Sequence, residues 1–257
     1  MKAVILAGGY GTRMGNLTKS LPKPMLRIGN KPIIWHIMKT YSSFGINDFI
    51  ICTGFKYKKI ESYFIKNCGH KAVVSYIKKK RIVEIKNYNS EGWNIVLVYT
   101  GNNTNTGGRI KKVKKYIGKE TFCLTYGDGV GDIDIKKLIE FHARKKVLAT
   151  VTAVHPTEKF GIIQFNGDKT KVHTFLEKPK RKDWINGGFF VLEPEVLGYI
   201  KNDSTVWEEG PLTDLTKMKM LAAYRHMGFW QCMDTAKDRK ELNVCWMMGK
   251  APWKVWR

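Results

Sequence analysis

A glycine-rich segment that ends in an arginine carries the strongest chemical signal in this sequence. It directly follows a short apolar run and reads Gly8-Gly9-Tyr10-Gly11-Thr12-Arg13. Glycines allow backbone N–H groups to approach phosphate oxygens closely, and they adopt a positive φ without strain. The guanidinium of Arg13 suits a bidentate contact with a phosphate group. The segment therefore predicts a phosphate-binding loop, and the alternative is a tight turn that binds nothing.

The spacing of these glycines excludes two common phosphate-binding motifs. A dinucleotide-binding fingerprint that begins at Gly9 requires a glycine at position 14, where the chain has Met14. A P-loop requires Gly-x-x-x-x-Gly-Lys followed by Ser or Thr, and the chain contains no such run. The loop is thus neither a hydride-transfer motif nor a Walker motif.

Three further charged residues are candidates for chemistry. Lys23 lies between Pro22 and Pro24, whose rings restrict the backbone and so favour a positioned charge. Asp128 lies between two glycines at the end of a predicted strand, where its carboxylate can face a ligand; the alternative is a plain strand-end turn. Asp234 directly precedes the last predicted helix, so its alternative role is the helix N-cap.

An alternation of strands and helices must position these residues. The five apolar residues 3–7 are typical of a central strand buried on both faces. Further strands are expected at residues 48–53, 94–99, 121–126 and 148–154, and helices at 32–44, 57–67, 109–117 and 133–145. This order predicts an α/β fold with three α/β/α layers, in which helices cover both faces of a mostly parallel mixed sheet.

The second half of the chain differs in character. Short strands are expected at residues 161–165, 171–176 and 187–192, separated by Gly, Asn and Pro, and a last helix at about 235–248. These strands are predicted to extend the sheet. No repeat or linker divides the chain, so residues 1–257 are expected to form a single domain.

The composition excludes several classes of protein. The chain has 257 residues with 43% hydrophobic and 26% charged residues, which are globular proportions. Its 45 Lys and Arg against 22 Asp and Glu give a net charge of +23. Because the basic residues are spread along the whole chain, a solvated surface is the favoured interpretation. Attraction of a small polyanionic substrate comes next, and nucleic-acid binding is the least favoured.

The chain shows no signal for a membrane, a disulfide scaffold or a metal motif built on His and Cys. No apolar run approaches the ~20 residues of a membrane span. The apolar run near Met1 meets Gly8 instead of a cleavage site, so a cytoplasmic protein is expected. The five cysteines are scattered without a C-x-x-C pair, and the six histidines form no close-spaced metal motif.

The loop and the prolines around Lys23 together resemble the signature of sugar-1-phosphate nucleotidylyltransferases. Further blocks resemble the members of that family that transfer a cytidylyl group to glucose 1-phosphate. They are spread over nearly the whole chain, at residues 31–38, 106–109, 126–129, 185–190 and 249–256.

The resemblance implies a Rossmann-like nucleotide-diphospho-sugar transferase fold and a specific reaction. CTP and α-D-glucose 1-phosphate would give CDP-glucose and pyrophosphate, with Mg²⁺ as cofactor, as a first step toward CDP-linked 3,6-dideoxyhexoses of surface polysaccharides. It implies a nucleotide-binding part at about residues 1–130, a sugar-binding part at about 131–257, and a homo-oligomer, either a trimer or a hexamer. Neither a nucleic acid nor a membrane is an expected partner.

The resemblance also assigns roles to residues. Arg13, Lys23 and Asp128 would be catalytic, and Asp128 and Asp234 would hold the metal. The nucleotide would contact Leu6, Ala7, Gly8, Gly9, Tyr10, Gly11, Thr12, Arg13, Lys23, Thr104, Arg109 and Gly127. For Arg109 the alternative is an exposed helix face.

The sugar phosphate would contact Glu177, Lys178, Asn186 and Gly187. For Lys178 the alternative is simple membership of the surface lysine cluster 178–182. The chain departs from the family pattern at three positions: Tyr10 stands where Leu is common, Gly210 where a carboxylate precedes proline, and Cys232 where proline is usual.

Overall fold

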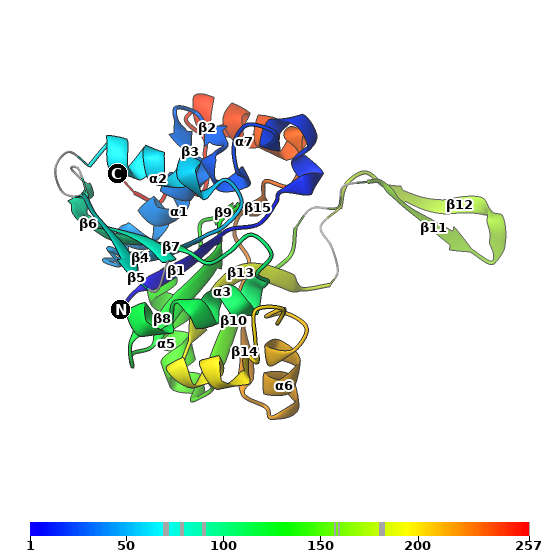
Figure 1. The fold of residues 1–257 in the computed structure, drawn as a ribbon. Coiled ribbons are helices and arrows are strands. Elements are labelled where there is room, and N and C mark those ends of the chain that lie inside the picture. Colours follow the sequence, from blue (N-terminus) through cyan, green and yellow to red (C-terminus); the bar gives the residue numbers. More distant parts are fainter. Residues whose placement is uncertain are drawn as a thin grey trace.

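The computed structural model describes residues 1–256 except 69–71, 78, 79, 89, 90, 157, 159 and 180–182. A nine-stranded sheet forms its centre, with helices on both faces and one two-stranded ribbon that extends away from the body (Figure 1). The strand order is β14-β10-β13-β8-β1-β4-β7-β6-β5. The bounds are β1 Ala3–Ala7, β4 Asp48–Thr53, β5 Ala72–Ile77, β6 Lys80–Tyr88, β7 Trp93–Tyr99, β8 Phe122–Tyr126, β10 Ala149–Val154, β13 Ile185–Leu192 and β14 Leu221–His226.

The sheet is mixed but mostly parallel, as predicted. Strands β6 and β13 are each antiparallel to both of their neighbours, and every other pairing is parallel. The remaining seven of the nine strands therefore run in one direction. Strand β1 pairs with β4 on one side and with β8 on the other. The chain order thus reverses between β1 and β8, which creates a crevice at their carboxyl ends.

Short elements complete the fold. The helices are α1 Ile33–Ser42, α2 Tyr57–Lys66, α3 Thr106–Lys112, α4 Lys114–Ile117, α5 Ile135–Lys145, α6 Pro211–Lys217 and α7 Ala236–Met247. Among the described residues, 3₁₀ helices include Thr12–Thr18, Lys23–Met25 and Pro194–Tyr199. Small strand pairs are β2 Arg27–Ile28 with β3 Lys31–Pro32, and β9 Gly129–Gly131 with β15 Trp230–Cys232. No helix in the described part of the chain has the length and apolar character of a membrane span.

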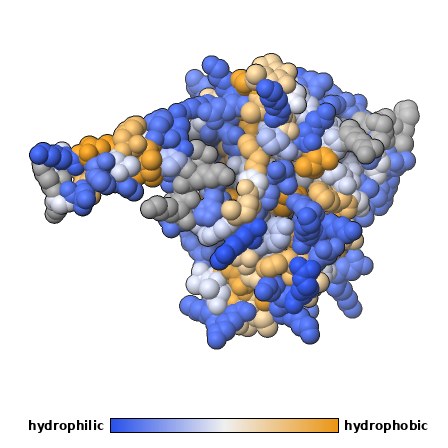
Figure 2. All heavy atoms as spheres, turned by 180° about the vertical axis from the view of Figure 1, so that it is seen from behind, coloured by the Kyte–Doolittle hydropathy of each residue, from blue (hydrophilic) through white to orange (hydrophobic). Residues whose placement is uncertain are grey.

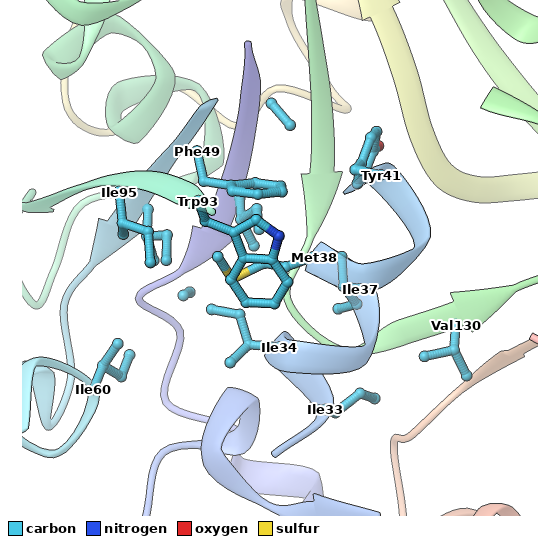
Figure 3. Close-up of a cluster of buried hydrophobic side chains, with 14 of the residues drawn as sticks. Ile33, Ile34, Ile37, Met38, Tyr41, Phe49, Ile60, Trp93, Ile95 and Val130 are labelled. Atoms are coloured by element: carbon cyan, nitrogen blue, oxygen red, sulfur yellow. The ribbon is translucent and has the colours of Figure 1, made fainter. Parts of the chain in front are cut away.

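Side chains along each central strand point alternately to the two faces of the sheet, so the interior consists of two hydrophobic cores. In β1, Ala3 and Ile5 face the core that contains α1 and α2, while Val4 faces the core that contains α3 and α6. Because successive strand residues point to opposite faces, a continuously apolar strand supplies both layers. In the first core the Trp93 ring packs against Phe49, with centroids 5.6 Å apart, next to the side chains of α1 (Figure 3). The three-layer prediction is confirmed.

Several predicted boundaries need correction. The helix expected at residues 109–117 begins at Thr106 and is interrupted at Val113. The basic stretch expected to be irregular contains strands β5 and β6. Lys80, Arg81 and Lys86 hide the pattern of β6, whereas β5 is a short apolar run without basic residues. Strand β14, also unexpected, is parallel to β10 and occupies the sheet edge.

The expected extension of the sheet by residues 161–176 is wrong. Strands β11 Ile162–Asn166 and β12 Asp168–Leu176 pair only with each other and form the projecting ribbon (Figure 1). Both sides of β10 are already occupied by β13 and β14, so no edge is free for them there. Hydrophobic residues lie among hydrophilic ones on the ribbon surface (Figure 2). In the ribbon register Ile163 lies opposite Phe175, and both side chains are exposed.

Buried His36 joins α1 to the C-terminal tail. Its Nε2 lies 3.0 Å from the carbonyl oxygen of Ile28, and its Nδ1 lies 3.4 Å from Nε1 of Trp253. Trp246 packs edge-on against the imidazole, with centroids 4.6 Å apart. Both hydrogen bonds suit the neutral ring that carries its proton on Nε2. Burial lowers the pKa of His36 from 6.5 to about 4.

This pKa predicts a pH-dependent stability. Between about pH 4 and 6.5 the unfolded chain binds a proton at His36 that the folded protein does not. Stability therefore rises with pH through that window, by up to about 3 kcal/mol, and is fully present above it. Urea unfolding from pH 4 to 7 measures the slope, and the neutral variant His36→Gln should lack this part of it. Equal slopes for the two proteins would contradict the assignment.

Candidate active site

A cavity of about 740 Å³ opens at the carboxyl ends of β1 and β8. It lies at the point where the strand order reverses, which is the preferred ligand position of such sheets. All residues predicted to contact the nucleotide line it, and so do Asp128, Asp234, Asn186 and Gly187. The structure therefore brings together residues from both halves of the chain.

The glycine loop forms one wall of the cavity and needs its glycines. Gly11 has φ 67°, in the left-handed region where a side chain would be strained. A Cβ atom at Gly8 would lie 2.1 Å from Nη1 of Arg109, so only glycine allows the arginine beneath the loop. At the tip, the Tyr10 hydroxyl donates a 2.5 Å hydrogen bond to Oδ1 of Asn103.

Two cations and two carboxylates meet at the floor of the cavity. Nζ of Lys23 lies 2.6 Å from Oδ2 of Asp128 and 2.5 Å from Oδ1 of Asp234. Nη1 of Arg13 lies 2.8 Å from Oδ2 of Asp234. The antiparallel pairing of β9 with β15 brings the carboxylates together: Cys232 lies opposite Gly129, and the Met233 amide donates to the Asp128 carbonyl.

These contacts change the acidity of the groups. Burial by itself would lower the pKa of Lys23, but the charge of Asp128 and the hydrogen bonds to both aspartates outweigh it and raise the pKa above 10.5. Burial would raise the pKa of Asp234, but the hydrogen bond and charge of Lys23, with the charge of Arg13, lower it below 3.8. Lysine and carboxylate are therefore both ionised at neutral pH.

Cys232 lies beside the same carboxylates. Its side chain is partly buried and lines the cavity. Burial, followed by the charge of Asp128, raises the pKa of its thiol. The sulfur is consequently a neutral thiol in the protein without ligands.

The N-cap alternative for Asp234 is wrong. Helix α7 is capped by Thr235, whose hydroxyl accepts from the Asp238 amide while the Asp238 carboxylate accepts from the Thr235 amide. This capping box satisfies the helix terminus without the side chain of Asp234. That carboxylate is left to the cavity.

The exposed-helix alternative for Arg109 is also wrong. Its side chain is 4% exposed and lies beneath the glycine loop. The guanidinium donates to one hydroxyl and several carbonyl oxygens. These bonds are to Thr53 O at 3.3 Å, Thr100 Oγ1 at 2.7 Å, Gly101 O at 2.7 Å, Gly8 O at 2.9 Å and Asn102 O at 3.2 Å. Arg109 thus joins the glycine loop to the segment after β7.

The residues predicted for the sugar phosphate are only partly brought together. Asn186 and Gly187, at the start of β13, line the cavity. The Asn186 amide donates a 3.2 Å hydrogen bond to the Tyr126 hydroxyl, and Trp230 Nε1 donates a 2.7 Å bond to the Gly187 carbonyl. Glu177 and Lys178 lie at the base of the ribbon, outside the cavity lining, where they form an exposed ion pair at 3.1 Å.

Glu208 was missed by the sequence interpretation. Its carboxylate accepts hydrogen bonds from the Tyr126 hydroxyl and, at 2.7 Å, from the Thr106 hydroxyl. Tyr126 and Thr106 both line the cavity, so Glu208 fixes two of its walls relative to each other. Glu208 lies two residues before Gly210, one of the positions at which the chain departs from the family pattern. No local pattern indicates that its carboxylate reaches β8.

Comparison with known proteins places the chain in a family. A family model described as nucleotidyl transferase matches residues 2–233. A Salmonella typhimurium protein named glucose-1-phosphate cytidylyltransferase is 48% identical over 258 residues, and the match covers 100% of both proteins. The chain belongs to the nucleotidyl transferase family. The resemblance inferred from the motifs is confirmed.

More distant relatives agree on this nucleotidyl transferase fold. A mannose-1-phosphate guanyltransferase of Yarrowia lipolytica is 29% identical over 93% of this chain and 62% of that protein. The solved structure of a UDP-glucose pyrophosphorylase complexed with UDP-glucose matches with a TM-score of 0.69 at 21% identity, covering 96% of this chain and 98% of that one. The inositol-1-phosphate CTP transferase from T. maritima matches with a TM-score of 0.68 at 15% identity, covering 100% and 98%. At such identities the structures show the fold alone.

The network around Arg109 predicts a stability effect. Arg109→Lys removes the planar fork and leaves several buried oxygens without donors, so the free energy of unfolding should fall by about 3 kcal/mol. Urea denaturation measures it. The matched control is Lys114→Ala on the exposed side of α4, which should stay within about 0.5 kcal/mol of wild type. Equal stability of the two variants would show that the network contributes nothing.

Proposed function

We propose that this nucleotidyl transferase transfers a cytidylyl group from CTP to α-D-glucose 1-phosphate and releases CDP-glucose and pyrophosphate. The observation that carries the proposal is the 48% identity, over the full length of both proteins, to a protein named glucose-1-phosphate cytidylyltransferase. The charge arrangement on the cavity floor supports it, because a triphosphate needs cations and a divalent ion needs carboxylates. The same fold with another NTP or hexose 1-phosphate is the alternative, and a non-catalytic relative that binds a nucleotide or nucleic acid is less favoured.

Of the three possible metal ligands on the cavity floor, the two carboxylates suit a magnesium ion and the thiol does not. Carboxylate oxygens such as those of Asp128 and Asp234 are the hard ligands that Mg²⁺ takes together with phosphate oxygens. When bound there, Mg²⁺ would neutralise phosphate charge as the transfer proceeds. Lys23 currently pairs with both carboxylates, so its ammonium must give way to the ion. The thiol of Cys232 is a soft donor and contributes nothing to magnesium binding.

The residues of the chain act by positioning and by charge. The backbone N–H groups of the glycine loop bind the phosphates, and Arg13 and Lys23 stabilise the negative charge that moves onto the departing pyrophosphate. A phosphate oxygen of the sugar attacks the α-phosphorus in line, so no residue has to form a covalent bond. Arg109 and Glu208 hold the segments that line the cavity in position through hydrogen bonds.

The sugar side of the proposal rests on Asn186, Gly187, Glu177 and Lys178. The first two residues already line the cavity next to Tyr126. For Glu177 and Lys178 to contact the sugar phosphate, the base of the ribbon must come closer to the cavity than it lies here. CDP-glucose is the proposed precursor of CDP-linked 3,6-dideoxyhexoses.

A homo-oligomer, a trimer or hexamer, is part of the proposal. Exposed apolar side chains on the ribbon support it, because such groups gain by being covered. The cross-strand pairs are Ile163 with Phe175 and Phe165 with Val172, all exposed. A second copy of the chain would cover them.

The reaction is tested by measuring pyrophosphate release with glucose 1-phosphate, Mg²⁺ and each nucleoside triphosphate in turn. Release with CTP should clearly exceed release with UTP, dTTP, GTP and ATP. A preference for another triphosphate would transfer the proposal to that nucleotide. No release with any of them, from folded protein, would overturn it.

The role of Asp128 is tested by Asp128→Asn. Losing the carboxylate should lower turnover by at least about 100-fold, the scale of a lost electrostatic contact in the transition state. Steady-state kinetics with CTP measure the loss. Asp214→Asn, on the exposed first turn of α6, is the matched control and should retain wild-type turnover. Near-normal turnover of the Asp128 variant would contradict the metal-ligand and catalytic assignment.

A further inference from the structure

The thiol of Cys232 lines the cavity, and the proposed function gives it no role. Side chains two residues apart in an extended segment point to the same side, so Cys232 and Asp234 face the cavity together. The β9–β15 pairing fixes Cys232 opposite Gly129, directly after Asp128. One ligand atom from each of Asp128, Cys232 and Asp234 lies within 4.8 Å of the others.

Two oxygens and one sulfur form a ligand set of mixed softness. Magnesium takes oxygen ligands almost exclusively, in octahedral geometry with several waters. Zinc and cobalt(II) take thiolate sulfur together with carboxylate oxygen, and three protein ligands leave a fourth position open for water or a phosphate oxygen. The family pattern noted from the sequence has proline where this chain has Cys232. A proline offers no ligand atom, so the third donor is a property of this chain.

The surroundings favour a cation at this point. Lys23 Nζ already lies within hydrogen-bonding distance of both carboxylates, which shows that the floor attracts positive charge. Arg13 contacts Oδ2 of Asp234, whereas Lys23 contacts Oδ1 of Asp234 and Oδ2 of Asp128, so it is the Lys23 ammonium that an ion bound by both carboxylates must displace. Cys232 and both aspartates line the cavity, and an ion reaches all three from the same opening.

We propose that Cys232 Sγ is a third ligand with which the Asp128–Asp234 site binds thiophilic divalent cations, Zn²⁺ or Co²⁺, in competition with Mg²⁺. The inference rests on the proposed function in that it takes these two carboxylates as the metal site. The sulfur binds as the thiolate, and its proton passes to the buffer when the ion binds. Such ions displace Mg²⁺ and inhibit the transfer reaction. They do so at lower concentrations than would be needed at a site made of the two carboxylates alone.

The test is an absorption titration of the full-length protein with Co²⁺. A thiolate ligand gives a sulfur-to-cobalt charge-transfer band in the near ultraviolet, which carboxylate ligands do not give. The band is expected in wild type and absent in Cys232→Ser. Competition with a chromogenic chelator should show Zn²⁺ affinity at least about tenfold lower in that variant, the scale of a lost metal-site contact.

Cys245→Ser is the matched control. Cys245 lies on α7, is partly buried like Cys232, and packs against the hydrophobic core instead of lining the cavity. This variant should keep both the band and the Zn²⁺ affinity of wild type. Circular dichroism verifies the folding of each variant, and Cys232→Ala replaces Cys232→Ser if the latter does not fold.

Two results would overturn the inference: a wild-type protein without the band, or a band that persists in the Cys232 variant. Pyrophosphate release from CTP with Mg²⁺ separates this failure from failure of the proposed function. If the protein turns over CTP but shows no band, Cys232 is not a metal ligand and the proposed function stands. If it shows the band but no turnover, the metal site is supported and the proposed reaction is contradicted.

Discussion

The site depends on one interaction, the pairing of the Lys23 ammonium with the carboxylates of Asp128 and Asp234. Lys23 comes from a short 3₁₀ helix near the N-terminus, and its Nζ contacts carboxylates 105 and 211 residues further along the chain. Three distant segments must therefore converge within hydrogen-bonding distance. The pairing of β1 with β8 brings Asp128 next to the glycine loop, and the pairing of β9 with β15 adds Asp234. A change in the register of either strand pair would separate the charges.

The two hydrophobic cores make that convergence rigid. Each central strand is apolar on both faces, so α1 and α2 on one side and α3 and α6 on the other fix its position. At the carboxyl ends of the strands, buried polar groups also restrain the loops. Arg109 joins the glycine loop to the segment after β7, and Glu208 joins Thr106 to Tyr126. Such networks hold loops in place only when every buried oxygen has a donor.

Much of this architecture could be predicted from the sequence, and the exceptions have physical causes. Strand β4 occupies the predicted residues because Phe49 to Cys52 form a short apolar run, which is typical of a central strand buried on both faces. Strand β6 could not be predicted, since Lys80, Arg81 and Lys86 obscure its pattern of alternation. Strand β5 contains no lysine or arginine, but it lies in the same stretch of the chain between basic residues, so its short apolar run was not recognised. The position of the β11–β12 ribbon depends on which sheet edges are free, and that is a property of the whole fold. In the site, the motifs indicated Lys23 and both aspartates, whereas the capping box that frees Asp234 and the reach of Glu208 depend on tertiary contacts.

The cavity floor is electrically balanced when nothing is bound. Lys23 and Arg13 carry two positive charges, and Asp128 and Asp234 carry two negative charges. An anion that entered alone would face two carboxylates, and a dication that entered alone would face two cations. In the proposed reaction the divalent ion lowers the net negative charge that the triphosphate brings to the floor, so each ligand would strengthen the binding of the other by the same factor. The arrangement of these four side chains would thus couple the binding of the proposed nucleotide to that of its divalent ion.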